Sequence, residues 1–414
     1  MINTEEPRIM FIDLNSAFAT AEQQAHPSLR GRPIGVTNRI SKYCCVIACS
    51  YEAKAFGIKV GMNLQEALKI APDFVMLESD PPKYHFVYQK LVKIMSDYSP
   101  NFQMKSIDEG IIDFHGMDYL LKNRTMSDIG YEIKNRVKEE VGNYTTINVG
   151  IAPNRFLAKQ AANWHKPNGL DVIDHNNLLQ YYEGIKLTDL TGIAKRFEAR
   201  LKASSIFTPS QFFNASADTL KRHVFHSVIG EDWYNRLHGW EVDQHPTNRG
   251  QVGRQFVMDV RTSDEKIILP RFHYLCETTG KKLRHIGMNA RGIIVWANLQ
   301  NGERWHARTT FTYSFYTDKQ IYSRAKKMFD TRPKHLIIAA TGITCFMLEP
   351  SNRDQRSLFE EINKEDLLTF AIDEINERYG TFMICSLNSL EGKKRVKQKI
   401  PFGSVNYFDI LLRG

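Results

Sequence analysis

The 414-residue chain lacks any long apolar run. A helix needs roughly 18 to 20 consecutive apolar residues to cross a bilayer, and no stretch of the chain approaches that length. We therefore expect no membrane-spanning segment. The first seven residues include two glutamates and lack the basic start and apolar centre of a secretory signal. A cytoplasmic location is the simplest interpretation.

Cysteine is scarce, and its spacing excludes the commonest zinc sites. The six cysteines form no CxxC pair and no Cys/His zinc pattern. Reduced thiols in a cytoplasm fit this usage. Internal repeats and low-complexity tracts are absent as well. Hydrophobic content of 42% and charged content of 24% are typical of a globular protein, and the length suggests roughly two to four domains.

Positive charge is present in excess, and it is concentrated in one region. The net charge is +9, and residues 250–349 contain 16 Lys and Arg against 8 Asp and Glu. A localised basic module suggests a polyanionic partner, most often nucleic acid; a solubilising surface is the alternative. Phosphate contacts of this kind cannot read base sequence. The residues predicted to contact phosphate here are Lys281, Lys282, Arg284, Arg304, His306 and Arg308.

The N-terminal part of the chain shows the order strand, helix, hairpin, helix, strand. Val87, Leu91, Ile94 and Tyr98, for example, recur on one helical face. This order predicts an α+β fold with a ferredoxin-like split βαβ sheet. The expected strands are 8–13, 102–108, 111–114 and 145–151, and the expected helices are 17–24, 87–98, 129–141 and 154–165.

Three carboxylates lie at strand ends in this scheme. Asp13 closes the apolar run 9–12, and Asp108 and Glu109 form the hairpin tip. If the fold brings them together, they repel one another, and a cation relieves the repulsion. Oxygen ligands suit Mg²⁺ or Mn²⁺, and two such ions can stabilise the attacking and leaving oxygens of a phosphoryl displacement. Ordinary polar strand ends are the alternative.

Other side chains near these segments suit a nucleotide. Tyr51 and Lys54 share one helical face and can hold a triphosphate; a solvated face is the alternative. Lys166 follows a helix end, where it is either a second cation for phosphate or a basic helix stop. Phe18 lies five residues after Asp13, either under a sugar or in the core.

A helix-hairpin-helix is predicted over residues 187–195. A Gly turn in this motif lets backbone N–H groups at a helix start meet a DNA phosphate. Gly192 and Lys195 are the candidate contacts, although Ala194 replaces the second glycine of the motif. A tight helical turn without DNA is the alternative.

Five segments together resemble the Y-family (UmuC/DinB type) translesion DNA polymerases, most closely the UmuC branch. They occur in the family's order and at its approximate spacing. The segments are Phe11–Phe18 with Glu22, Ser50–Met62, Ser106–Gly110, Gly150–Lys159 and Lys166–Gly169.

The resemblance implies a two-metal active site. Asp13 and Asp108 would bridge two Mg²⁺ ions, for which Mn²⁺ can substitute, and Glu109 would complete the site that activates the primer 3′-hydroxyl. Leu14 would offer its backbone carbonyl. The chemistry implied is addition of dNTPs to a primer opposite damaged DNA.

It also implies a nucleotide site with three departures from the family. Tyr51, Lys54 and Lys166 would grip the triphosphate, and Phe18 would be the steric gate that excludes a ribose 2′-hydroxyl. Lys54 stands where the family usually has Arg, which gives up a bidentate phosphate contact. The other departures are Ala48, at a position that often carries a hydroxyl, and Ser16-Ala17, where bulkier residues are common.

The family architecture divides the chain into the parts of a right hand. The expected domains are palm (1–18 and 82–172), fingers (19–81), helical thumb (173–243), linker (244–252), an α/β little finger that grips DNA (253–350) and a C-terminal tail (351–414).

The C-terminal tail contains a segment that resembles the Gln-x-x-Leu-Phe peptide by which proteins bind the bacterial sliding clamp; the matching residues are Gln355, Leu358 and Phe359. In that peptide the apolar side chains enter a pocket of the clamp. Local packing of the loop is the alternative.

The partners implied are primer-template DNA, dNTPs, the clamp and possible accessory subunits, with action at the nucleoid in an SOS-type response. A partner-dependent accessory of the same fold and a nucleotidyl cyclase are the competing functions.

Overall fold

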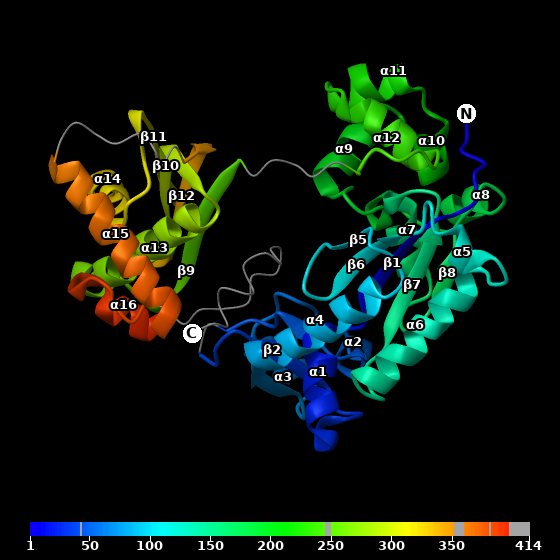
Figure 1. The fold of residues 1–414 in the computed structure, drawn as a ribbon, viewed down its shortest axis with the longest axis horizontal. Helices are drawn as coiled ribbons and strands as arrows, with labels where there is room; N and C mark the ends of the chain where they lie inside the picture. Colours follow the sequence, from blue (N-terminus) through cyan, green and yellow to red (C-terminus); the bar gives the residue numbers. More distant parts are fainter. Residues whose placement is uncertain (42–43, 245–249, 352–359, 381, 397–414) are drawn as a thin grey trace. The chain divides into compact units, whose positions relative to one another are not determined.

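The computed structural model describes residues 1–41, 44–244, 250–351, 360–380 and 382–396. These residues form two compact units, one up to residue 244 and one from residue 250 onward (Figure 1). Within the described ranges, none of the helices combines the length and the apolarity that crossing a membrane requires.

A five-stranded sheet forms the centre of the first unit. Its strand order is β5 (Phe102–Met104), β6 (Glu109–Asp113), β1 (Ile9–Leu14), β7 (Ile147–Ala152) and β8 (Leu170–Val172). Strand β1 runs antiparallel to both β6 and β7, so the split βαβ sheet predicted from the sequence is confirmed. Strand β8 pairs parallel to β7 and was not predicted.

Helices cover both faces of this sheet. On one face, α7 (Arg155–Trp164) approaches β7 so closely that a Cβ at Gly150 would lie 2.1 Å from the carbonyl oxygen of Ala158. Only glycine permits this contact. The other face carries α4 (Pro81–Ser96) and α6 (Met126–Glu140), whose apolar residues share one core with Met10 and Ile12. The short α5 (Asp118–Leu121) precedes α6.

A smaller three-stranded sheet lies between β1 and α4 in the sequence. Its central strand β2 (Ile34–Thr37) pairs antiparallel with β3 (Ala48–Cys49) and parallel with β4 (Val75–Glu78). The Ser50 and Asn63 side chains cap helices α2 and α3 by accepting backbone N–H bonds. The helical elements here are α1 (Ala17–Ala25), η1 (Pro27–Leu29), α2 (Tyr51–Ala55) and α3 (Leu64–Ile70).

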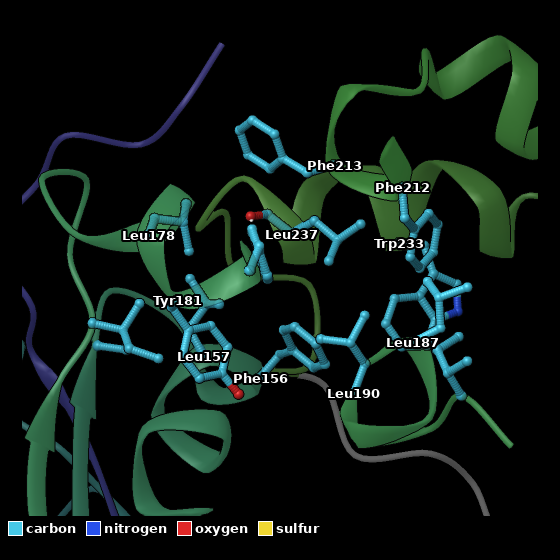
Figure 2. Packing of buried hydrophobic residues seen from close by; sticks show 14 of the residues in the cluster. Phe156, Leu157, Leu178, Tyr181, Leu187, Leu190, Phe212, Phe213, Trp233 and Leu237 are labelled. Atoms are coloured by element: carbon cyan, nitrogen blue, oxygen red, sulfur yellow. Dashed lines mark hydrogen bonds between the residues drawn. The ribbon is translucent and has the colours of Figure 1, made fainter. Parts of the chain in front are cut away.

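The remainder of the first unit is helical and joins the sheet through one aromatic-rich core. Phe156 and Leu157 of α7 face the same cluster as Tyr181, Phe212 and Trp233 (Figure 2). The elements are α8 (Leu178–Glu183), η2 (Leu187–Asp189), α9 (Lys195–Ala203), α10 (Pro209–Asn214), α11 (Ala217–Thr219), η3 (Leu220–Phe225) and α12 (Ile229–Leu237).

The second unit is built on a four-stranded antiparallel sheet. Its strand order is β11 (Arg304–Phe315), β10 (Met288–Leu299), β12 (Ile338–Pro350) and β9 (Gln251–Thr262). Helices α13 (Glu265–His285) and α14 (Asp318–Phe329) supply apolar residues to the core on one side of this sheet.

The described part of the C-terminal region packs on α13. It comprises α15 (Glu360–Tyr379), η4 (Leu387–Ser389) and α16 (Leu390–Arg395). The Arg284 side chain donates to Asp373 at 2.5 and 2.9 Å, and the Ser389 hydroxyl donates to Glu277 at 2.6 Å. These helices are therefore a further layer of the second unit.

Candidate active site

The three predicted carboxylates meet at one edge of the five-stranded sheet. Asp13 pairs directly with Glu109 across β1 and β6, and the backbone N–H of Leu14 donates to the carbonyl oxygen of Asp108 at 2.8 Å. The predicted strand 102–108 ends early, at Met104. Past it, the Ser106 hydroxyl accepts from the backbone N–H groups of Asp108 and Glu109 and donates to the Asp108 carboxylate.

The charges of these carboxylates influence one another. Partial burial raises the pKa of Asp108, and the charges of Asp13 and Glu109 raise that pKa further, whereas the bond from Ser106 lowers it. The charged form of Asp108 is thus disfavoured in the fold. A cation at this edge would relieve that cost, and the three side chains offer the oxygen ligands that Mg²⁺ takes.

Two lysines already face the site. Lys166 Nζ donates to Asp13 Oδ2 at 2.8 Å, and Lys159 Nζ donates to Glu109 Oε2 at 2.8 Å. Across the described ranges, no three His, Cys, Asp or Glu side chains are arranged as a ready metal-binding group. Asp13 and Glu109 are each paired with a lysine, so a metal ion at this place would have to replace those ion pairs.

Tyr51 and Lys54 lie beside Asp13, as a shared nucleotide site requires. Lys54 Nζ donates to the Ser16 hydroxyl at 2.7 Å and lies 4.3 Å from the centre of the Tyr51 ring. Burial raises the pKa of Tyr51, and the charge of Asp13 raises it further. Ser16 adopts a left-handed backbone conformation with φ of 49° and makes no capping bond to α1. Such strain in a non-glycine residue is common at functional sites.

Phe18 lies on α1 at the wall of a pocket that reaches Asp108. Its ring stacks on Tyr84 of α4, with 4.5 Å between ring centres. The Tyr84 hydroxyl donates to the buried Glu22 carboxylate at 2.7 Å, and Lys83 donates to the same carboxylate at 2.6 Å. The pocket is lined by Leu14, Ala17, Phe18, Tyr84, Ile107 and Asp108.

The predicted helix-hairpin-helix is a 3₁₀ turn followed by a helix. Gly192 has a φ of 99° between η2 and α9, where an L side chain would be strained. Gly192 and Lys195 are both exposed. Ala194 precedes α9 and provides no side-chain cap, so the first N–H groups of the helix receive no bond from that residue.

Six residues of the second unit were predicted to contact DNA, and they differ in their exposure to solvent; His306 on β11 is among the exposed ones. Arg304 and Arg308 are exposed on β11, where their guanidinium groups lie over the rings of Trp296 and Phe346 at 4.8 and 4.3 Å. Lys282 on α13 is partly buried.

The prediction for Lys281 and Arg284 is corrected by their burial. Both are only 6% exposed, because the C-terminal helices cover α13. Arg284 is held by Asp318 and Asp373, and Lys281 lies 5.5 Å from the ring centre of Phe382. Neither side chain is available to a phosphate in this arrangement.

Several residues at the site were not assigned from sequence. Lys159 and Glu22 belong to segments that carry the family resemblance, but charge and spacing along the chain did not reveal their partners. Nothing in the sequence distinguished Tyr84 from the other aromatic residues of its amphipathic helix.

The predicted clamp-binding residues Gln355, Leu358 and Phe359 lie outside the described residues.

Comparison with known proteins identifies the family. Residues 12–163 match the impB/mucB/samB family, and residues 249–358 match the impB/mucB/samB family C-terminal domain. DNA polymerase IV of Moorella thermoacetica is 30% identical over 400 residues, which cover 93% of this chain and 96% of that protein. DNA polymerase IV of Pelotomaculum thermopropionicum is 28% identical over 397 residues, covering 92% and 95%.

A solved structure shares the fold. A chimeric Y-family DNA polymerase matches with a TM-score of 0.70 at 21% identity, over 83% of this chain and 99% of that one. The relatives above bear the name DNA polymerase IV, so the predicted closeness to the UmuC branch is not supported.

Proposed function

Because the chain belongs to the Y family of DNA polymerases, we propose that it is a template-directed, low-fidelity polymerase that adds dNTPs to a primer opposite damaged DNA. The observation that supports this most directly is the meeting of Asp13, Asp108 and Glu109 at one sheet edge, beside the pocket walled by Phe18. Members of this family are metal-dependent nucleotidyltransferases.

Asp13, Asp108 and Glu109 would hold the metal, with the Leu14 carbonyl as a further oxygen ligand. Two bound Mg²⁺ ions, or Mn²⁺ in their place, would supply charge neutralisation at the attacking and leaving oxygens. The chain itself would align the primer end and the triphosphate. In that arrangement Lys159 and Lys166 are released from the carboxylates, and Lys166 becomes free to meet phosphate oxygens.

The incoming dNTP would lie between the small sheet and the carboxylates. Tyr51, Lys54 and Lys166 would contact its triphosphate, since all three surround Asp13. Phe18 would lie against the sugar and exclude a 2′-hydroxyl. Its stack on Tyr84 supports this role, because a ring packed against a neighbouring ring cannot easily give way.

Primer-template DNA would be held through its phosphates. Gly192 and Lys195 would contact one phosphate at the start of α9, and Arg304 and Arg308 would contact others from β11. Lys282 is retained as a weaker candidate. The region proposed to grip DNA is the described sheet of the second unit, which lies within residues 250–349, where most of the chain's excess positive charge is found.

The sliding clamp is proposed as a partner that binds through Gln355, Leu358 and Phe359. Accessory subunits and nucleoid association in an SOS-type response are proposed from the family resemblance as well.

The competing function, a partner-dependent accessory protein without its own activity, is not favoured, because the three carboxylates are intact. A nucleotidyl cyclase is disfavoured by the basic module, which would have no role in cyclising a nucleotide.

Primer extension tests the proposal. The purified chain, with Mg²⁺ and four dNTPs, should extend a primer on both undamaged and lesion-bearing templates. The Asp13→Ala/Asp108→Ala double variant should be inactive under the same conditions. Cyclisation of labelled ATP without DNA would favour the cyclase instead. Absence of extension even after adding the cognate clamp would refute the polymerase proposal.

A further inference from the structure

Three buried polar side chains surround the loop that carries Lys166. Asn15 follows β1, Asn148 lies in β7 and Lys134 lies in α6, and their exposed fractions are 2%, 0% and 8%. Buried polar groups cost free energy unless they are hydrogen-bonded. Each of the three reaches residues 165–169 through hydrogen bonds, and Asn15 also bonds to Thr146 and Tyr51.

The two amides connect the end of β1 to both ends of the loop. Asn15 Oδ1 accepts from the backbone N–H of Asn168 at 2.9 Å, and Asn15 Nδ2 donates to Asn148 Oδ1 at 2.7 Å. Asn148 Nδ2 in turn donates to the carbonyl oxygen of His165 at 3.2 Å. The Thr146 hydroxyl donates to Asn15 Oδ1 at 2.9 Å and fixes the orientation of that amide.

Lys134 holds the loop from the other side. Its ammonium donates to the carbonyl oxygens of Asn168 and Gly169. A Cβ at Gly169 would lie 2.2 Å from the His165 carbonyl oxygen, so the loop folds back on itself with no room for a side chain. With both ends fixed, the loop directs Lys166 toward Asp13.

We propose that Asn15, Asn148 and Lys134 are positioning residues that fix the 165–169 loop, so that Lys166 is in place before a triphosphate binds. This inference rests on the proposed polymerase function. A lysine on a mobile loop would lose backbone and side-chain freedom when it bound phosphate, and that loss would weaken binding. A loop fixed in advance avoids the loss.

A double-mutant cycle separates positioning from a general structural role. The variants are Asn15→Ala, Lys134→Met and Lys166→Ala, alone and in pairs with Lys166→Ala, and kcat and KM are measured for one dNTP. Asn15→Ala and Lys134→Met should each raise KM about tenfold, with a smaller change in kcat. In the Lys166→Ala background Lys134→Met should alter KM by less than about twofold. The effect of Asn15→Ala should also shrink there, keeping only the part that comes from its bond with Tyr51.

Asn154→Ala is the matched control. Asn154 is also a buried amide, and it donates to the carbonyl oxygens of Arg236 and Trp240, away from the 165–169 loop. The factor by which Asn154→Ala changes KM should multiply with the factor for Lys166→Ala. If the KM factors of Asn15→Ala and Lys134→Met also multiply with that of Lys166→Ala, the inference is overturned. It is likewise overturned if Asn15→Ala and Lys134→Met lower kcat and leave KM unchanged.

Circular dichroism melting sets a temperature at which all variants are folded. If Asn15→Ala does not fold, Lys134→Met carries the test, because it keeps the alkyl stem and removes only the ammonium. Incorporation by the unmodified protein is measured first. Its absence even with the cognate clamp would refute the proposed function. Activity combined with multiplicative pairs would refute only the positioning role.

Discussion

Lys166 Nζ donates a hydrogen bond to Asp13 Oδ2 at 2.8 Å, although 153 positions separate the two residues in the chain. Lys159 makes the equivalent contact with Glu109. Two carboxylates of the candidate site are thus balanced by lysines, while Asp108 has a raised pKa and only the Ser106 hydroxyl as its described side-chain hydrogen-bond donor. This difference makes Asp108 the most informative carboxylate to change.

Asp108→Asn should lower nucleotide incorporation by about a thousandfold or more, because it removes the proposed ligand shared by both metals. DNA affinity should stay near that of the unmodified protein, since the proposed DNA contacts lie elsewhere. Single-nucleotide extension and fluorescence anisotropy measure the two effects. Without divalent metal at pH 7, the variant should also melt at a higher temperature, because a disfavoured buried charge is removed.

The control for this change is Asp97→Asn. Asp97 pairs with Arg136 at the surface, and its replacement should leave incorporation unchanged. Incorporation by Asp108→Asn within tenfold of the unmodified protein would remove Asp108 from the metal site.

Phe18→Ala should raise the rNTP-to-dNTP ratio of kcat/KM by about tenfold or more, because the ring would no longer occupy the space of a 2′-hydroxyl. Competition between matched rNTP and dNTP measures the ratio. Phe86→Ala is the control, since Phe86 is an exposed aromatic residue on α4. An unchanged ratio in Phe18→Ala would exclude Phe18 as the gate.

Arg304→Ala/Arg308→Ala should weaken DNA binding and reduce the dependence of log affinity on log salt by about two, because each arginine would neutralise one phosphate. Stability should fall by about 1 kcal/mol at most for each change, because both side chains are exposed and only their contacts with the Trp296 and Phe346 rings are lost. Binding titrations over a range of salt concentrations measure the slope. An unchanged slope would argue against both arginines as phosphate ligands.

Arg284→Ala is the counterpart of the Arg304/Arg308 variant: it should lower the stability of the protein and leave the salt dependence of DNA binding unchanged. Arg284 pairs with Asp318 and Asp373 in a buried position, and removing one partner of a buried ion pair costs about 3–5 kcal/mol. Urea unfolding should show this destabilisation. At a temperature where the variant is folded, the salt slope of DNA binding should stay the same; a reduced slope would reinstate Arg284 as a phosphate ligand.

Glu277 should make stability depend on pH near neutrality. Burial raises the pKa of Glu277 to about 7, against an ordinary value of 4.5. The unfolded chain therefore loses this proton at lower pH than the folded protein, and stability falls as pH rises from 4.5 to about 7. The facing groups are Asp318, Arg284 and His273, and burial lowers the pKa of His273 to about 4, so it stays neutral over most of this window.

Glu277→Gln removes the titration and should isolate it. The stability advantage of the variant over the unmodified protein should grow by about 3 kcal/mol at most between pH 4.5 and about pH 8. Chemical unfolding at a series of pH values measures the difference. A constant difference would mean that Glu277 is not the titrating group.

Leu358→Ala/Phe359→Ala should eliminate stimulation by the sliding clamp without lowering basal synthesis. The physical reason is removal of the two apolar side chains that would enter the clamp pocket. Primer extension with and without the clamp measures the effect. Stimulation that persists in this variant would count against the peptide.

Local patterns in the sequence determined the element order and the approximate positions of the central strands, although the hairpin strand predicted over 102–108 ends at Met104. Apolar residues recur at strand spacing in β1 and at helical spacing in α4. This spacing predicts which face of each element is buried, because burial of those same residues drives folding. Asp13 and Asp108-Glu109 were recognisable because each interrupts or follows such a pattern. The strand β8 was missed, since three residues are too few to show a period.

Which charged residues remain accessible was decided by the tertiary structure. Arg284 and Arg304 are equivalent as basic residues of one module, yet α15 supplies Asp373 to the first from 89 positions away, and the second remains exposed. The ion pair of Lys166 with Asp13 and the hydrogen bond between Asn15 and the 165–169 loop also join residues that are far apart in the chain. Such contacts depend on how distant segments pack, and no local period in the sequence encodes them.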